Sequence, residues 1–388
     1  MEKKKILGFI SMVLSLSILY GCSVDSGTAS VKDSDSESVS IESDSTVEEP
    51  EELETISLNV VDNLKGKTGK RAFRTEGRTF YRNGVLACDL SCTGVRFNAC
   101  CKGEVSAKFT TSAECYFTIY INGERQRDRI CARPADSDFI KIAEFDEYGE
   151  YEIRIVKQSQ YPMAYSGISD VRLTGSFGTR PAEKERFIEF YGDSMMNGSN
   201  IYKGGTSAAT SDATLAFGYL TALALNADCN IIGRGGMALN RNGNTDGLLE
   251  IWDLCGGVSS PQVSPYGFDR VPDCVVVEIG DNDYRVNHVP GKYTQGVRDM
   301  VLNLRSAYGN DVKIVWCHSY TDVAAELWTS VTKDILDQLN ADGNILYCPI
   351  PISSCPKSEG GDGLHPDVDG AANMASTLTS FINENIYS

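Results

Sequence analysis

The chain has 388 residues, of which 41% are hydrophobic and 9% aromatic, enough for sizeable buried cores. This composition excludes a wholly disordered protein, and the length favours two or three domains. The formal net charge is -17 at pH 7. Such a charge argues against a nucleic-acid-binding protein, because contact with phosphates needs a basic surface.

The first 22 residues have the pattern of a secretory signal peptide. Three lysines at positions 3–5 precede an apolar run over residues 6–19. As a helix this run would rise only about 21 Å, too little for a bilayer core of about 30 Å. The run ends in Leu19-Tyr20-Gly21-Cys22, which resembles the bacterial lipobox, whose cysteine receives a lipid. We therefore expect a lipid anchor at Cys22, with plain secretion as the alternative.

Residues 23–54 form an acidic segment with almost no large apolar side chains. They contain eleven Asp and Glu residues against one lysine, Lys32. Such a segment cannot bury enough surface to offset the entropy of ordering it. It is predicted to be a disordered tether. The anchor and the tether together predict a folded body on the outside of a bacterial cell.

Lipidation of Cys22 would leave twelve cysteines in the rest of the chain. An even number outside the cytoplasm permits disulfides, but a chain of this size folds without them. None of the cysteines has the Cys/His spacing of a zinc site. We therefore expect mostly buried free thiols and no metal at these positions: Cys88, Cys92, Cys100, Cys101, Cys115, Cys131, Cys229, Cys255, Cys274, Cys317, Cys348 and Cys355.

Short alternating runs separated by turn residues fill positions 56–177. Residues 115–121 alternate as a strand, and Asn122-Gly123 after them is a strong hairpin signal. Residues 151–156 alternate in the same way, and no segment has a sustained helical period. The pattern predicts a β-sandwich domain, jelly-roll-like, over residues 55–178.

Strand and helix patterns alternate over residues 183–388. Buried strands are predicted at 186–191, 230–232, 274–279 and 313–317, and helices at 215–225, 296–307 and 331–339. This alternation predicts an α/β domain, a parallel sheet with helices on both faces. Functional residues of such sheets gather at the carboxyl ends of the strands.

Three polar clusters follow predicted strands or lie in the terminal loop: Gly192-Asp193-Ser194, Gly280-Asp281-Asn282-Asp283 and Asp362-Gly363-Leu364-His365. A serine on a tight turn after a strand exposes its hydroxyl to a base. The asparagine amide can donate to a developing oxyanion. A carboxylate three residues before a histidine can orient the ring, so that Nε2 takes the serine proton. The chain has only three histidines, so this context is informative.

In this order the clusters resemble those of the SGNH hydrolases, also called GDSL-like lipases and acylhydrolases. The resemblance implies a catalytic triad: Ser194, Asp362 and His365. It implies an oxyanion hole built from the N–H groups of Ser194 and Gly236 and the amide of Asn282. Within the segment 233–236 the spacing of the family's double glycine favours Gly236, and Gly235 is the alternative.

The complete arrangement is similar to carbohydrate esterase family two, in which a β-sandwich precedes an SGNH domain. The resemblance covers roughly residues 70–385 and includes Gly77-Arg78 and the segments 187–194 and 224–228. It implies removal of acetyl groups from plant polysaccharides of the xylan or glucomannan type. Leu364 departs from the aromatic residue frequent before the family's histidine. Asp362 supplies the acid that several members lack.

The positions of the remaining aromatic, acidic and histidine residues indicate their expected roles. Tyr284, beside the oxyanion amide, is the aromatic side chain with positional support for substrate binding. Asp283 is expected to brace the oxyanion loop through hydrogen bonds instead of serving as the triad acid. Trp316 is expected in the core. His288 and His318 have no carboxylate three residues earlier and are expected to lie in a surface loop and near the sheet edge.

The sequence thus predicts a monomeric serine esterase that needs no metal or organic cofactor. Its expected partner is an acetylated polysaccharide or oligosaccharide, with membrane contact only through the lipid anchor and no nucleic acid. Two alternatives stay open. One is an SGNH esterase for another ester, such as an acetylated bacterial cell-wall polymer. The other is a non-catalytic surface protein that binds carbohydrate.

Overall fold

The computed structural model describes residues 49–287, 290–318, 331–350 and 364–388. The predicted signal peptide with Cys22, nearly all of the predicted tether, Cys355 and Asp362 lie outside the described residues. Residues Thr46–Ser388 belong to one compact unit. Within the described part of the chain, no helix is both long enough and apolar enough to cross a bilayer.

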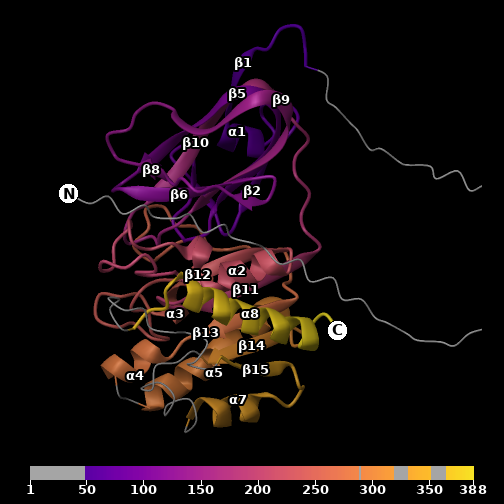
Figure 1. Ribbon diagram of the computed structural model, residues 1–388. Coiled ribbons are helices and arrows are strands. Elements are labelled where there is room, and N and C mark those ends of the chain that lie inside the picture. Colours follow the sequence, from indigo (N-terminus) through magenta and orange to yellow (C-terminus); the bar gives the residue numbers. More distant parts are fainter. Residues whose placement is uncertain (1–48, 288–289, 319–330, 351–363) are drawn as a thin grey trace, which may run out of the picture. The chain divides into compact units, whose positions relative to one another are not determined.

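An antiparallel sheet of ten strands occupies the first part of the described chain (Figure 1). Its main path runs β3-β4-β10-β5-β9-β6-β7, with β1, β2 and β8 paired onto it. The strands are β1 Thr55–Asn59, β2 Phe73–Glu76, β3 Phe80–Arg82, β4 Val85–Ala87, β5 Gly94–Thr111, β6 Cys115–Ile121, β7 Glu124–Arg125, β8 Ile130–Ala132, β9 Ile140–Lys157 and β10 Ser166–Phe177.

The predicted hairpin joins β6 to β7. Asn122 and Gly123 both have positive φ, 51° and 82°, as a two-residue hairpin turn of this hand requires. The long strands β5 and β9 pair along most of their length, with register shifts near Gly103 and Ser106 that bend the ladder. This domain confirms that the region is rich in β-strands, while its arrangement as a jelly-roll-like sandwich stays a prediction.

One helical turn interrupts the β region, where no helix was expected. Helix α1, Val60–Leu64, begins after Asn59, whose side chain accepts a hydrogen bond from Asp62 N at 3.0 Å. Val60, Val61 and Leu64 are buried in the core of the sheet. Five residues are too few to give a readable helical period, so the prediction missed this element.

The second part of the chain contains a parallel sheet of five strands in the order β12-β11-β13-β14-β15. This confirms the predicted parallel sheet, and strand order reverses beside β11, at a topological switch point. The strands are β11 Arg186–Gly192, β12 Ala227–Gly233, β13 Cys274–Glu278, β14 Lys313–His318 and β15 Ile345–Pro349.

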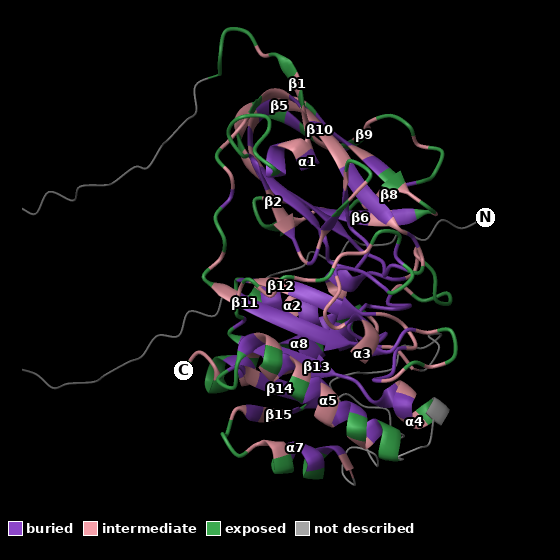
Figure 2. Ribbon diagram, turned by 180° about the vertical axis from the view of Figure 1, so that it is seen from behind, coloured by how far each residue is buried: buried purple, intermediate pink, exposed green. Residues whose placement is uncertain are grey.

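Helices cover both faces of the parallel sheet (Figure 1). Alternate strand residues face opposite sides, so Phe190 packs with α2 and α8 whereas Tyr191 packs with α3, α5 and α7. Trp316 is fully buried, as predicted, and Figure 2 shows the central strands β11 and β13 as almost entirely buried. The helical elements are η1 Ala213–Leu215, α2 Phe217–Ala224, α3 Leu248–Ile251, α4 Asp281–Asn287, α5 Pro290–Tyr308, α7 Lys333–Leu339 and α8 Val368–Asn385.

A buried ion pair connects the two sheets. Arg78, just after β2, reaches Glu189 on β11 at 3.0 Å, and both side chains are fully buried. The guanidinium also donates to Trp252 O at 2.6 Å and lies 3.9 Å from the ring centroid of Tyr266. Glu189 accepts a further hydrogen bond from Tyr308 Oη at 2.5 Å. The charges are therefore paired and hydrogen-bonded, as burial requires.

The cysteines of the described residues are free thiols. Eight of the eleven are buried and three are half-buried. Burial raises the pKa of Cys88 to about 12, and in the same way it raises the pKa of Cys255 to about 11. These thiols behave as small core residues, as the sequence predicted.

Candidate active site

The first two polar clusters meet at one edge of the parallel sheet. Gly192 at the end of β11 is in register with Gly233 at the end of β12 and with Glu278 at the end of β13. The loops that follow these three strands therefore start side by side, at the switch point of the sheet. A Cβ on Gly233 would lie 2.1 Å from Gly192 O, so this close approach requires glycine.

Ser194 lies in the turn that follows β11. The preceding carboxylate, Asp193 Oδ1, accepts a hydrogen bond from Met195 N at 3.0 Å, and Ser194 O accepts one from Ser199 N at 3.0 Å. These bonds hold the turn against the sheet edge. Ser194 is 8% exposed. A largely desolvated hydroxyl held on a fixed turn suits a nucleophile that a base must reach from one side.

Asn282 lies in the first turn of α4, Asp281–Asn287, a helix that the sequence did not predict. Its Nδ2 donates to Asp193 Oδ2 at 3.0 Å and to Met237 O at 2.9 Å. The side chain thus connects the serine turn with the loop that follows β12. Both amide hydrogens have protein acceptors, so donation to an oxyanion would be shared with one of them. That role stays a prediction. Asp281 and Asp283 in the same first turn favour a helix there, through the macrodipole.

Asp283 braces the loop after β12, as predicted. Its two oxygens accept Leu239 N at 3.2 and 3.0 Å, and its side chain is buried. Burial raises the pKa of Asp283 to about 7, against the opposing effect of the hydrogen bond from Leu239 N. The carboxylate therefore holds the segment that carries the predicted oxyanion glycine, and it titrates near neutrality.

The two candidate oxyanion glycines differ in their partners. Gly235 N donates to the side-chain oxygen of Gln160, which comes from the loop between β9 and β10. No hydrogen bond from Gly236 N to another described residue is found, and Gly236 has a φ of 74°. Gly236 as the backbone donor of the oxyanion hole stays a prediction, with Gly235, whose N–H already has an acceptor, as the alternative.

The loop that carries Gln160 anchors the β domain at this site. Tyr161 Oη donates to Asp246 Oδ2 at 2.6 Å, and both residues are buried. A Cβ on Gly257 would lie 1.9 Å from the Tyr161 ring, so the ring occupies the space above that glycine. Ser91, from another loop of the β domain, donates to Asn197 Oδ1 beside the serine turn. The sequence carried no signal for these contacts.

Four carboxylates gather behind the serine turn. Burial raises the pKa of Asp193 well above its usual range, and the negative charges of Glu278 and Asp281 raise it further. The same burial explains why Asn282 and Met195 both donate to Asp193, because a buried acid needs hydrogen-bond donors in either protonation state. Asp283 is the fourth member of this group.

The third cluster is described only in part. Leu364 and His365 are half-buried residues shortly before α8, whose first turn is capped by Asp367, the acceptor of Gly370 N at 2.9 Å. Asp362 lies outside the described residues, so the triad stays a prediction. Tyr284 is half-buried on α4, and its role in substrate binding also stays a prediction. His288 lies outside the described residues, and His318 ends β14.

Comparison with known proteins identifies the domain that carries this site. The family described as GDSL-like Lipase/Acylhydrolase matches residues 188–378, which include the serine turn, the glycine loop, Asn282 and His365. Residues 188–378 form a GDSL-like lipase/acylhydrolase domain. An acetylxylan esterase / glucomannan deacetylase from Cellvibrio japonicus is 28% identical over 185 residues of the chain. That match covers 44% of this chain and 51% of the relative, so it spans about half of the relative's length.

Solved structures extend the fold likeness of the GDSL-like domain to the β domain before it. A family two carbohydrate esterase from Cellvibrio japonicus has a TM-score of 0.72 at 20% identity, covering 86% of this chain and 98% of that one. An acetyl xylan esterase from Butyrivibrio proteoclasticus has a TM-score of 0.71 at 17% identity, covering 86% and 99%. The chain therefore shares the two-part fold of these esterases.

Proposed function

We propose that the protein is a serine esterase that removes O-acetyl groups from plant cell-wall polysaccharides of the xylan or glucomannan type. One observation carries the proposal. The turn with Ser194, the glycine loop and Asn282 meet at a single sheet edge, and hydrogen bonds from Asn282 to Asp193 and Met237 O join them. The GDSL-like domain supports ester hydrolysis as the reaction class.

The reaction would proceed through an acetyl-enzyme. Ser194 Oγ attacks the acetyl carbonyl while His365 takes the hydroxyl proton, and the same proton passes to the leaving sugar oxygen. The backbone N–H groups of Ser194 and Gly236 and the amide of Asn282 would stabilise the negative oxygen of the tetrahedral intermediate. Water, deprotonated by His365, then attacks the acetyl-serine, and His365 returns that proton to Ser194 Oγ as the acyl C–O bond breaks and acetate leaves.

Asp362 is proposed to orient His365 as the triad acid. Asp362→Asn should then lower kcat strongly while changing KM little, because the carboxylate does not contact ground-state substrate. Retention of more than about a third of wild-type kcat, a barrier change under about 1 kcal/mol, would count against this role. A backbone carbonyl would then be the better candidate for orienting the ring.

The substrate class is proposed from the relatives. The Cellvibrio japonicus relative is named an acetylxylan esterase / glucomannan deacetylase, and a Clostridium thermocellum family two esterase is described in complex with cellohexaose. Both names point to β-linked plant polysaccharides. Tyr284, half-buried on α4 beside Asn282, is the proposed sugar contact on this chain.

Acetate release from three acetylated polymers tests the function. We expect faster release from acetylated xylan or glucomannan than from acetylated peptidoglycan, and turnover of a short-chain colorimetric acetyl ester. Fastest release from peptidoglycan would favour the bacterial cell-wall alternative. Binding to xylan without acetate release from any polymer or ester would favour the non-catalytic binding alternative.

Attachment to the outside of the bacterial cell through Cys22 is a further part of the proposal. It rests on the apolar run and the lipobox-like Leu19-Tyr20-Gly21-Cys22. The full chain should fractionate with membranes, and Cys22→Ala should change its processing or release it. A mature protein with an unmodified amino terminus downstream of Cys22 would contradict anchoring. Monomeric mass in solution is expected.

A further inference from the structure

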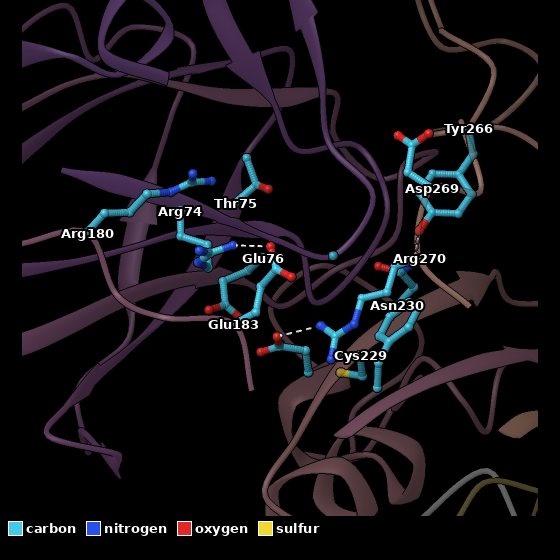
Figure 3. A pocket seen from close by; sticks show the side chains of 13 residues that line it. Arg74, Thr75, Glu76, Arg180, Glu183, Cys229, Asn230, Tyr266, Asp269 and Arg270 are labelled. Atoms are coloured by element: carbon cyan, nitrogen blue, oxygen red, sulfur yellow. Dashed lines mark hydrogen bonds and ion pairs between the residues drawn. The ribbon is translucent and has the colours of Figure 1, made fainter. Parts of the chain in front are cut away.

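A pocket of about 290 Å³ lies at the other end of the parallel strands from the candidate active site. Its lining includes Phe187 near the start of β11, residues 228–230 at the start of β12 and residues 74–77 of the β domain. Figure 3 shows side chains from both domains around it, among them Arg74, Cys229 and Asn230. The strands are seven residues long, so the pocket is separated from Gly192 by about 20 Å. It is therefore a separate site.

A chain of buried and half-buried ion pairs borders this pocket, and Glu76, Asp228 and Arg270 of the chain line the pocket themselves. Glu76 pairs with Arg154 at 2.9 Å and with Arg96 at 3.3 Å. Asp228 pairs with Arg96 at 3.0 Å and with Arg270 at 2.9 Å. The chain begins and ends on an arginine, so three cations share two carboxylates. The chain of ion pairs therefore carries one more positive than negative charge. Two of its arginines, Arg96 and Arg154, are only 3% and 7% exposed.

Arg180 adds a second cation at the pocket wall. Within the described ranges, no carboxylate lies within ion-pairing distance of Arg180, and its buried Nε has no hydrogen-bond acceptor there. Burial lowers the pKa of Arg180, and the positive charges of Arg74 and Arg71 lower it further, whereas the negative charge of Glu183 opposes them. Arg74 itself is paired with Glu183 at 2.5 Å. Figure 3 shows the Arg180 side chain among the pocket residues, near Arg74 and Thr75.

Excess buried positive charge is unfavourable unless an anion compensates it. The guanidinium group forms paired, charge-assisted hydrogen bonds to planar carboxylates. Four carboxylates line the pocket: Glu76 and Asp228 belong to the chain of ion pairs, Glu183 is paired with Arg74, and Asp269 is exposed. They would repel a doubly charged anion more strongly than a singly charged one. These charges favour a monoanion over a phosphate dianion.

The size and lining of the pocket indicate more than a bare ion. The pocket volume of about 290 Å³ is much larger than the volume that one ion the size of a water molecule would occupy. The Thr75 hydroxyl and the Tyr266 ring supply a polar group and an aromatic surface for a ring with hydroxyls. We propose that this pocket binds the carboxylate of an acidic sugar, a uronate, through Arg180. The proposal does not depend on the esterase activity.

Calorimetric titration of the purified protein with D-glucuronate tests the proposal, with D-glucose, acetate and inorganic phosphate as comparison ligands. Saturable binding of glucuronate, tighter than that of acetate or phosphate and absent for glucose, is expected. Phosphate or acetate binding at least as tight as glucuronate binding would overturn the assignment to a sugar carboxylate. Failure of glucuronate to bind would overturn the site itself.

Matched variants assign the binding to Arg180. Arg180→Gln should weaken glucuronate binding by about tenfold or more, the loss of one charge-assisted interaction. Arg127→Gln removes the same charge from an exposed position outside the pocket and should leave binding unchanged. Equal binding by the two variants would contradict the proposal. Arg180→Lys keeps the charge, so its affinity for glucuronate should lie between those of the wild type and Arg180→Gln. This variant keeps the test valid if the glutamine variant misfolds. Hydrolysis of a small acetyl ester should be unchanged in all three.

Discussion

The side-chain amide of Asn282 donates to the carboxylate of Asp193 at 3.0 Å, and its second hydrogen goes to Met237 O at 2.9 Å. Asn282, at the start of α4, thus fixes the positions of the loops after β11 and β12 relative to each other. The site is assembled by polar contacts among three strand ends, and no single loop contains it.

Asn282→Ala is predicted to affect both catalysis and stability. Loss of one oxyanion donor lowers kcat by about 10²–10³. Loss of the donor to buried Asp193 destabilises the fold by about 1–3 kcal/mol. Steady-state kinetics at a temperature where the variant is folded, together with urea unfolding, separate the two effects. Asn244→Ala, at an exposed position, is the control. A destabilised variant with wild-type kcat would mean that Asn282 acts only as a brace.

Asp283 should make stability depend on pH. Its pKa is about 7 in the folded protein, well above the usual value for aspartate. Between about pH 4 and 7 the folded state keeps a proton that the unfolded state has lost, so stability falls as pH rises through that window. Asp193, whose pKa is also raised by burial, acts in the same direction.

Asp283→Asn removes one of these titrations but keeps an oxygen that can accept Leu239 N. The fall in unfolding free energy between pH 4.5 and 7.5, measured by urea denaturation, should therefore be smaller in the variant than in the wild type. The wild-type change from this residue is on the order of 4 kcal/mol. An unchanged slope in the variant would show that Asp283 is ionised throughout.

Gln160 is predicted to position the glycine loop from the β domain. Gln160→Ala leaves Gly235 N without its acceptor and loosens the segment that carries Gly236. We expect kcat to fall about tenfold with a small change in KM, because the donor geometry matters most in the transition state. Gln126→Ala, in a loop of the same domain, is the control. Gln160→Glu, which keeps an acceptor, should recover part of kcat.

The sequence predicted the elements whose signal is local. Alternating residues identified strands of the β domain, buried apolar runs identified strands of the parallel sheet, and the order of clusters placed Ser194 and Asn282 at one sheet edge. The bracing role of Asp283 followed from its place beside Asn282. The contact from Gln160 to Gly235 could not be predicted, because it joins residues 75 positions apart through a loop with no periodicity. Helix α1 was not predicted, because five residues are too few to show a helical period.

Arg78 and Glu189 are predicted to couple the stability of the two domains. Arg78→Met leaves the Glu189 carboxylate buried without its cation and should destabilise the protein by about 3–5 kcal/mol. Arg78→Met combined with Glu189→Leu should recover a large part of that loss, because no unpaired charge remains. Thermal unfolding of the three proteins measures this, with Arg127→Met as the exposed control. A double variant less stable than either single variant would contradict the account.

Ser194 as the site of the acetyl intermediate is the central claim, and rapid quenching of a reaction with an acetyl ester tests it most directly. Peptide mass spectrometry of the quenched wild-type enzyme should find an acetyl group on Ser194. Ser194→Ala should show neither the acetylated peptide nor measurable acetate release while keeping the wild-type unfolding curve. Acetylation of another residue, or near-wild-type turnover by folded Ser194→Ala, would contradict the account.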